Sequence, residues 1–157
     1  MGTRSITTVQ SRWDSEGEYK VHATVYRHYD GYLSGHGAWL ADFLKMIRVK
    51  NGISGDWDKA RDVNGPGRLA ARLVVDMYDN DLEPDLMPHN TDCGQEYHYQ
   101  ISVEFGVDWE GAGAPVSVAV FDGPIVFFGC GGDECTNKIF DGSVEEFGEF
   151  VNSQVSN

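Results

Sequence analysis

Apolar and polar residues alternate in two segments near the N-terminus. The segments RSITTVQ and EYKVHATVY both have a period of two, and in the second every other residue from Tyr19 to Val25 falls on one face. Such alternation is typical of strands with one buried and one exposed face, and a polar SEG turn separates the two segments. We therefore predict a β-hairpin whose second strand ends near Arg27.

The middle of the chain changes from a period of two to the helical period. Between about residues 37 and 49, apolar residues recur at the i, i+3, i+4 and i+7 positions of an amphipathic helix. A loop rich in glycine and aspartate leads to Pro66, which suits the first turn of a helix because its missing N–H is not needed there. We expect a second helix from Pro66 to about Asn80.

A strand pattern returns in the C-terminal part of the chain. In EYHYQISVEF, residues 96–105, tyrosines and other apolar residues alternate strictly with polar ones. PVSVAVFDGPIVFF predicts two more short strands about a hairpin turn at Asp122 and Gly123. Ser143 and Glu146 have the spacing of a capping box ahead of an apolar stripe, which predicts a C-terminal helix.

The predicted order of elements is β-β-α-α-β-β-β-α. Consecutive strands joined by short turns favour antiparallel pairing, and helices gathered between and after them favour packing on one face. We predict a single α+β domain over residues 1–157, with an antiparallel sheet of about five strands and helices packed on one face. A chain of 157 residues is long enough to build one such core.

Charge narrows the classes of partner. The chain has 25 Asp and Glu against 12 Lys and Arg, a formal net charge of −13. Such a charge repels the phosphate backbone and disfavours direct binding of nucleic acid, although an acidic surface can also mimic nucleic acid toward a basic site on another protein. No apolar run approaches the ~20 residues of a membrane helix, and the N-terminus lacks a signal-peptide pattern. We expect no membrane partner and a cytoplasmic location.

Cysteine usage argues against disulfide and metal sites. Cys93, Cys130 and Cys135 are an odd number in a chain without an export signal. The spacing in GCGGDEC is wider than that of a zinc knuckle, and no second Cys or His pair stands at a matching distance. We expect reduced thiols, no metal and no cofactor.

The stretch YRHYDGYLSGHG, residues 26–37, lies at the predicted junction between the second strand and the first helix. Ser34 is a candidate cap for that helix, while Gly35 and Gly37 permit close approach to backbone N–H groups at the positive end of the helix dipole. A turn that served only as a connection would need neither the two histidines nor an arginine beside an aspartate. The stretch is therefore a candidate anion site.

The start of the second helix has a similar composition. Its sequence, NGPGR, brings Asn64 and Arg68 to a glycine-rich helix N-terminus. We expect the two helix starts, together with Arg27, to hold the phosphates of one anionic or nucleotide-like ligand. The tyrosines of the first stretch then offer ring faces for a base or ribose.

An enzymatic interpretation uses the same residues differently. His36 or His28 would act as a general base oriented by Asp30, with Cys93 as a nucleophile. The acidic residues close to Cys93 in TDCGQEY raise a thiol pKa, which argues against an activated thiolate. No Ser-His-Asp order, Walker loop or metal-ligand pattern is legible, so binding without catalysis is favoured.

Four blocks of the chain occur in an order that resembles a family of small, mostly uncharacterised proteins of bacteriophages and bacterial genomes. The blocks are MGTRS, YRHYDGYLSGHG followed by LADFL, NGPGRLAARLV and TDCGQEY, which together span residue 1 to about residue 105. In the pattern of that family, the position of His28 is usually Gln, Leu33 is usually Pro, and Arg often stands at Thr91. The resemblance thus implies that His28 is not essential for proton transfer.

We place the candidate site where the junction, the second helix start and TDCGQEY meet. This placement assumes that the strand at 96–105 neighbours the second strand in antiparallel register. The candidate ligand-binding residues are Arg27, Tyr29, Asp30, Tyr32, Ser34, Gly35, His36, Gly37, Asn64, Arg68, Asp92, Glu96 and Tyr97.

The leading hypothesis is a non-catalytic, phage-type binding protein that holds a small anionic or nucleotide-like ligand, with sequestration of a host defence signal as one form of that role. One alternative is an acidic interaction protein, a nucleic-acid mimic that inhibits a host defence complex. Another is a nucleotide-processing enzyme that uses His36. A homo-oligomer is as compatible with the sequence as a monomer, and a phage-encoded protein would act in the host cytoplasm.

Overall fold

The computed structural model describes residues 2–14, 16–52, 57–89, 91, 93–105, 113–122 and 137–156. The elements follow the order β1 (Ser5–Arg12), β2 (Lys20–Arg27), a short π-helical turn (Leu33–Gly37), α1 (Ala38–Met46), β3 (Arg48–Lys50), β4 (Asp62–Asn64), α2 (Pro66–Asp79), β5 (Asp85–Leu86), β6 (Tyr97–Glu104), β7 (Val116–Asp122), β8 (Asn137–Ser143) and α3 (Val144–Val155). The predicted α+β class is confirmed.

The main sheet has six strands in the order β5-β2-β1-β6-β7-β8, and β3 and β4 form a separate parallel pair. β1 lies in the middle and pairs with β2 in antiparallel and with β6 in parallel register. The remaining pairs of the main sheet are antiparallel. The prediction of a wholly antiparallel sheet is therefore wrong at β1 and β6, because the chain between β2 and β6 crosses over the sheet through two helices and returns in the direction of β1.

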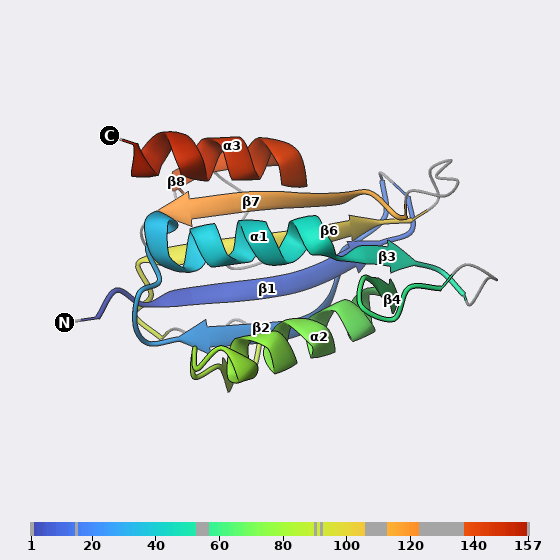
Figure 1. Ribbon diagram of the computed structural model, residues 1–157, viewed down its shortest axis with the longest axis horizontal. Helices are drawn as coiled ribbons and strands as arrows, with labels where there is room; N and C mark the ends of the chain where they lie inside the picture. The colour runs from blue at the N-terminus through green and yellow to red at the C-terminus, as the bar shows by residue number, and fades with distance from the viewer. Residues whose placement is uncertain are drawn as a thin grey trace.

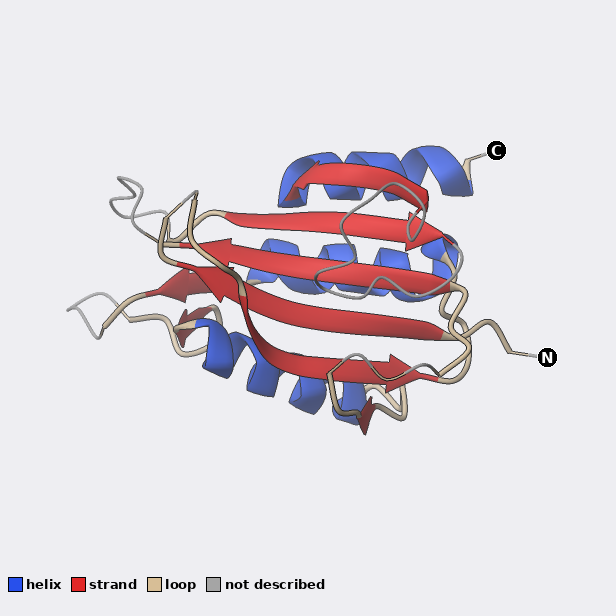
Figure 2. Cartoon of the chain, turned by 180° about the vertical axis from the view of Figure 1, so that it is seen from behind, coloured by secondary structure: helices blue, strands red, loops and turns tan. Residues whose placement is uncertain are grey.

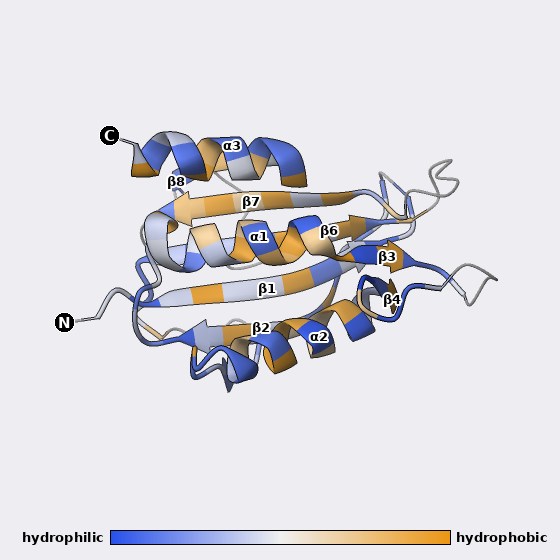
Figure 3. Ribbon diagram, in the orientation of Figure 1, coloured by the Kyte–Doolittle hydropathy of each residue, from blue (hydrophilic) through white to orange (hydrophobic). Residues whose placement is uncertain are grey.

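All three helices cover the same face of the sheet, as predicted (Figure 1). Seen from behind, the strands lie in front of the helices, and no described helix covers that face (Figure 2). The buried residues of α1 and α2 are apolar, and orange stripes alternate with polar positions along both helices (Figure 3). No helix in the described part of the chain has the length and apolar character needed to cross a bilayer.

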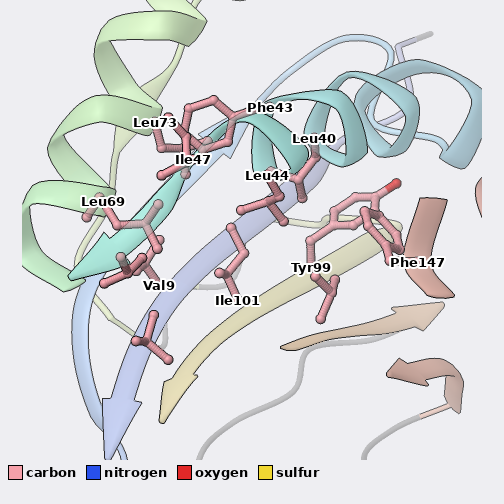
Figure 4. Packing of buried hydrophobic residues seen from close by; sticks show 14 of the residues in the cluster. Val9, Leu40, Phe43, Leu44, Ile47, Leu69, Leu73, Tyr99, Ile101 and Phe147 are labelled. Carbon is pink, nitrogen blue, oxygen red and sulfur yellow. The ribbon is translucent and has the colours of Figure 1, made fainter. Parts of the chain in front are cut away.

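The core fills the layer between the helices and the sheet. Val9 of β1 and Ile101 of β6 are fully buried beneath Leu40, Leu69 and other helical side chains (Figure 4). Burial of such side chains contributes about 1.5–3 kcal/mol each, which is why the helices keep one apolar stripe facing the strands. This packing explains why the helical periodicity was a reliable guide to the arrangement of the layers.

Polar side chains occupy the opposite face of the central strands. Since residues alternate along a strand, Thr8 and Gln10 lie on the side away from the core residue Val9. Thr8 Oγ1 is 2.9 Å from His98 Nε2, and Gln10 Nε2 donates to Ser102 Oγ at 2.8 Å. These buried hydrogen bonds join β1 to β6 directly.

The boundaries of α2 and α3 match the sequence signals, whereas α1 ends at Met46 and not near residue 49, because the chain turns into β3 at Arg48. α2 begins at Pro66 and ends before Asn80, as predicted. The capping box at the start of α3 is also confirmed: Ser143 Oγ accepts from Glu146 N at 3.2 Å, and Glu146 Oε2 accepts from Ser143 N at 2.8 Å. These local interactions depend on two or three neighbouring residues and are therefore visible in the sequence.

The short strands are less visible in the sequence. β3, β4 and β5 were not predicted, because two or three residues are too few to establish a period. β8, residues 137–143, was not predicted either, because its sequence NKIFDGS does not alternate between apolar and polar residues. The hairpin turn predicted at Gly123, its second strand, Cys130 and Cys135 all lie outside the described residues.

Replacing the cap of α3 tests the role assigned to Ser143. We expect Ser143→Ala to lower the free energy of unfolding by about 1 kcal/mol and the Tm by about 2–4 °C, because the N–H of Glu146 loses its acceptor. Thermal unfolding followed by circular dichroism measures this change. Ser34→Ala is the matched control, since no side-chain cap bond is formed at the start of α1. Equal losses in both variants would contradict the assignment.

Candidate functional site

The strand-to-helix junction is formed where it was predicted. β2 ends at Arg27, and the π-helical turn from Leu33 to Gly37 runs directly into α1 at Ala38. Ser34 is exposed and makes no cap hydrogen bond to either helical segment. Its predicted role as a helix cap is therefore wrong, because the π-helical turn supplies backbone acceptors to the start of α1.

The backbone N–H groups of the junction are already bonded within it. Gly35 N and Gly37 N donate to Tyr32 O at 3.0 and 3.3 Å, and His36 N donates to Asp30 O at 2.8 Å. Asp30 adopts a positive φ of 55° that turns its carbonyl toward the helix. An anion at this helix start would have to compete with these carbonyls, so the junction does not provide the open cradle of N–H groups that its glycines suggested.

The glycines instead allow close packing. A Cβ on Gly31 would lie 2.8 Å from the backbone of Arg4 and from Ser5 Cβ, and one on Gly37 would lie 3.3 Å from the hydroxyl of Tyr99. Gly31 N also donates to Thr3 O, and Gly31 O accepts from the Tyr99 hydroxyl, both at 2.8 Å. The glycine-rich sequence therefore joins the junction to β1 and β6.

His36 lies in the interior, with none of its surface exposed. Its Nε2 is 2.7 Å from Thr7 Oγ1, and its Nδ1 is 3.3 Å from Arg27 Nη1. A guanidinium only donates, so Nδ1 accepts and Nε2–H donates to the threonine. Burial and the charge of Arg27 lower the pKa of His36 to about 3. This geometry suits a neutral structural group that ties α1 to β1 and β2, and it leaves no ring nitrogen for a substrate.

Tyrosines of the junction do reach the surface. Tyr29 is 55% exposed and Tyr32 is 39% exposed. The hydroxyl of Tyr26 is 2.6 Å from His28 Nδ1, and the ring of His28 meets that of Tyr29 edge to face at 4.5 Å. These rings form a small aromatic cluster on the surface.

TDCGQEY lies near the junction, although the predicted pairing of its strand with β2 is wrong. β6 pairs with β1 rather than with β2, so the two segments meet across the first residues of β1. Arg4 O accepts from Glu96 N at 2.9 Å and from Tyr97 N at 3.3 Å. Cys93 is half-buried, and Asp92 lies outside the described residues.

The start of α2 lies at the other end of the sheet from the junction. Ser5 pairs with Arg27 at the junction end, whereas Ser11 lines a cavity of about 260 Å³ with Gly65 and Pro66. Ser5 and Ser11 are six positions apart along β1, a span of roughly 20 Å. α1 and α2 run in opposite directions in Figure 1, so their first turns lie at opposite ends of the sheet. The prediction that both helix starts hold one ligand is therefore wrong.

The two residues proposed at the second helix start have local roles. Asn64 Oδ1 accepts from Gly52 N at 2.9 Å, which ties the loop after β3 to β4. Arg68 is exposed and does not line the cavity at Gly65. Neither residue approaches the Arg27 end of the sheet, because each belongs to the segment that enters α2.

A larger cavity of about 750 Å³ lies between the end of α1, β3 and the start of α3. Apolar residues such as Leu44 and Val49 line its floor, and the basic residues Lys45, Arg48 and Arg61 also line it. Gly148 of α3 gives room to the lysine, since a Cβ there would lie 3.0 Å from Lys45 Cε. One carboxylate, Glu145, also lines it, so basic side chains outnumber acidic ones by three to one in a chain whose net charge is −13. We call this space the cationic cavity.

One wall of the cationic cavity is held by a buried carboxylate. Asp62 Oδ1 is 2.9 Å from Arg48 Nε, and Oδ2 is 2.9 Å from Lys50 Nζ. Burial acts to raise the pKa of Asp62, but the hydrogen bond from Asp58 N and the cations Lys50 and Arg48 outweigh it and lower this pKa to about 2. The carboxylate therefore stays ionised and fixes the direction of Arg48.

No local sequence pattern marks this cavity. Its basic residues come from α1, from β3 and from the loop before β4, and their proximity depends on tertiary packing. One signal was nevertheless present: five of the 12 Lys and Arg residues lie between residues 45 and 61. A local excess of basic residues in an acidic chain is a reason to expect a cationic site there.

Comparison with known proteins gives no relative from which a role could be transferred. The chain matches no family model, no curated protein and no solved structure at a significant level. The candidate site therefore rests on the geometry described above.

Buried histidines predict how stability depends on pH. Burial is the main cause that lowers the pKa of His36 to about 3 and that of His98 to about 4, whereas the unfolded chain protonates both near pH 6.5. The contribution of these two histidines to the free energy of unfolding is thus fully present above pH 6.5, and it decreases as the pH is lowered from there toward 4. Urea unfolding at several pH values will show this slope.

The contribution of His36 can be separated from that of His98. We expect His36→Gln to reduce the slope by up to about 1.4 kcal/mol per pH unit, because one fewer proton is taken up on unfolding. The variant also loses some stability at neutral pH, where Thr7 and Arg27 contact a different side chain. An unchanged slope would show that His36 is protonated equally in the folded and unfolded states.

Proposed function

We propose that the protein is a non-catalytic binding protein that holds a small anion with an apolar body in the cationic cavity. The observation that supports this most directly is a lining with three basic side chains, one carboxylate (Glu145) and several apolar residues, in a chain with a net charge of −13. An acidic surface repels anions, so a cationic cavity within it selects ligands that gain both apolar burial and charge pairing. Carboxylates and phosphates that carry an aliphatic or aromatic group have this chemistry.

The size of the cavity supports a small molecule as the ligand. Sites for small molecules usually enclose about 300–1,000 Å³, and the cationic cavity, at about 750 Å³, falls within that range. Two other cavities, of about 180 and 260 Å³, are smaller than this range. The cationic cavity is therefore the best candidate among these three.

The three cations differ in how freely they can meet a ligand. Arg48 is paired with Asp62, and Arg61 Nε donates to Met46 O at 3.3 Å. No ion pair or hydrogen bond is recorded for the side chain of Lys45 within the described residues. Lys45 is thus the group that we expect to pair with the anionic head of the ligand, with the planar guanidinium groups at the sides.

The lining residues favour binding over catalysis. Among the described residues, this lining includes neither His nor Cys, and the hydroxyl of Ser143 is engaged as the cap of α3. His36, the candidate base, is enclosed in the core with both ring nitrogens bonded. A protein of this kind would act by removing its ligand from solution, and sequestration of a signal molecule remains one form of the proposal.

Calorimetry with defined probes tests the proposal. We expect octanoate, indole-3-acetate or adenosine 5′-monophosphate to bind with a Kd below about 1 mM. Lys45→Gln and Arg61→Gln should each weaken the best of these probes about tenfold, which corresponds to about 1.4 kcal/mol. The probe should be recovered chemically unchanged after incubation with the protein.

A charge-matched control separates the cationic cavity from other basic sites. Lys20→Gln removes one positive charge at the cavity beside Gly65, at the opposite end of the sheet from the junction, and should leave the affinity unchanged. If none of the three probes binds below about 1 mM, or if Lys45→Gln binds as tightly as the parent protein, the proposal is wrong. If adenosine 5′-monophosphate binds tightly and the other two probes do not, the natural ligand is nucleotide-like.

A further inference from the structure

A second, smaller groove lies on the other flank of α1, between α1 and α2. Its volume is about 180 Å³, and apolar residues such as Trp39, Phe43 and Met46 provide most of its surface. Asp42, Arg72, Asp76 and Asn80 also line it. A space of this size is below the usual range for small molecules, so it is suited to a single side chain presented by a partner.

The floor of this groove is aromatic. The rings of Trp39 and Phe43 are nearly parallel, with centroids 5.4 Å apart and an angle of 11° between their planes. His36, which is fixed in the core, lies nearly parallel to Trp39 on the preceding turn at 5.9 Å. The orientation of Trp39 is thus set from the interior, and the rings are arranged before any partner arrives.

The rim of the groove is anionic on balance. Arg72 is neutralised there, because its Nε donates to Asp76 Oδ1 at 2.8 Å and its Nη2 donates to Ala60 O at 3.2 Å. Asp42 is exposed, and no ion pair is recorded for it within the described residues. A carboxylate beside an indole ring is suited to a planar cation that pairs with the charge and stacks on the ring.

We propose that the groove between α1 and α2 binds an arginine side chain on a basic segment of a partner protein. Arginine is preferred to lysine because its flat guanidinium packs against Trp39 while donating to Asp42. The net charge of −13 favours the approach of a basic segment, and Met46, which is 59% exposed at the edge, offers contact to the neighbouring apolar atoms of that segment. This surface is separate from the cationic cavity, and neither proposal depends on the other.

A pair of peptides that differ only in charge tests the proposal on the whole protein. The probes are acetylated and amidated Gly-Gly-Arg-Gly-Gly and the same peptide with citrulline, the neutral isostere of arginine. In ¹H–¹⁵N NMR titrations we expect the indole N–H of Trp39 and the backbone N–H of Met46 to shift with the arginine peptide. At least fivefold weaker binding is expected for the citrulline peptide. Equal affinities would overturn the proposal.

Two variants separate the groove from general attraction to an acidic surface. Asp42→Asn should weaken the arginine peptide at least fivefold, while Glu149→Gln, which removes an exposed charge on α3, should leave its affinity unchanged. Equal weakening by both substitutions, or shifts that map away from Trp39, would show that the peptide binds through overall charge, and would overturn the proposal. The comparison of the two peptides requires no substitution and stands even if a variant is unstable.

Discussion

The position of α1 depends on a group of buried polar contacts around His36. This residue bonds to Thr7 on β1 and to Arg27 at the end of β2, and its ring meets that of Tyr99 on β6 edge to face at 5.1 Å. Three strands therefore hold the start of one helix at a single point. Because a buried polar group without a partner costs about 1–3 kcal/mol, few other placements of this helix satisfy all these groups.

The two proposed binding surfaces follow from that placement. Asp42 and Lys45 are three residues apart on α1, and they line the cavities toward α2 and α3, respectively. If α1 were rotated about its axis, Lys45 and Asp42 would no longer line their cavities, and the apolar residues of α1 would no longer face the sheet. The buried histidine thus determines, at a distance, where an anion and a cation can bind, although it contacts neither.

Sequence patterns anticipated the layers better than the site. The stripe of α1, the proline at the start of α2 and the capping box of α3 are local signals, and each was confirmed. The pairing of β6 with β1, in contrast, depends on a crossover through two helices, which no local pattern encodes. The glycines of the junction were interpreted as openings for a ligand, but they give room to neighbouring backbone and to Tyr99. Composition alone does not distinguish these two uses.

The polar pairs on the helix-free face have a consequence for how the central strands align. Apolar contacts on the other face tolerate small shifts of one strand along the other. The hydrogen bonds from Thr8 to His98 and from Gln10 to Ser102, in contrast, form only when β1 and β6 have their native register. A slip of β1 by one residue would turn Thr8 and Gln10 toward the core and bring Val9 to the opposite face. The two hydrogen bonds thus help to fix the register of β1 and β6, a parallel pair whose strands lie far apart in the sequence.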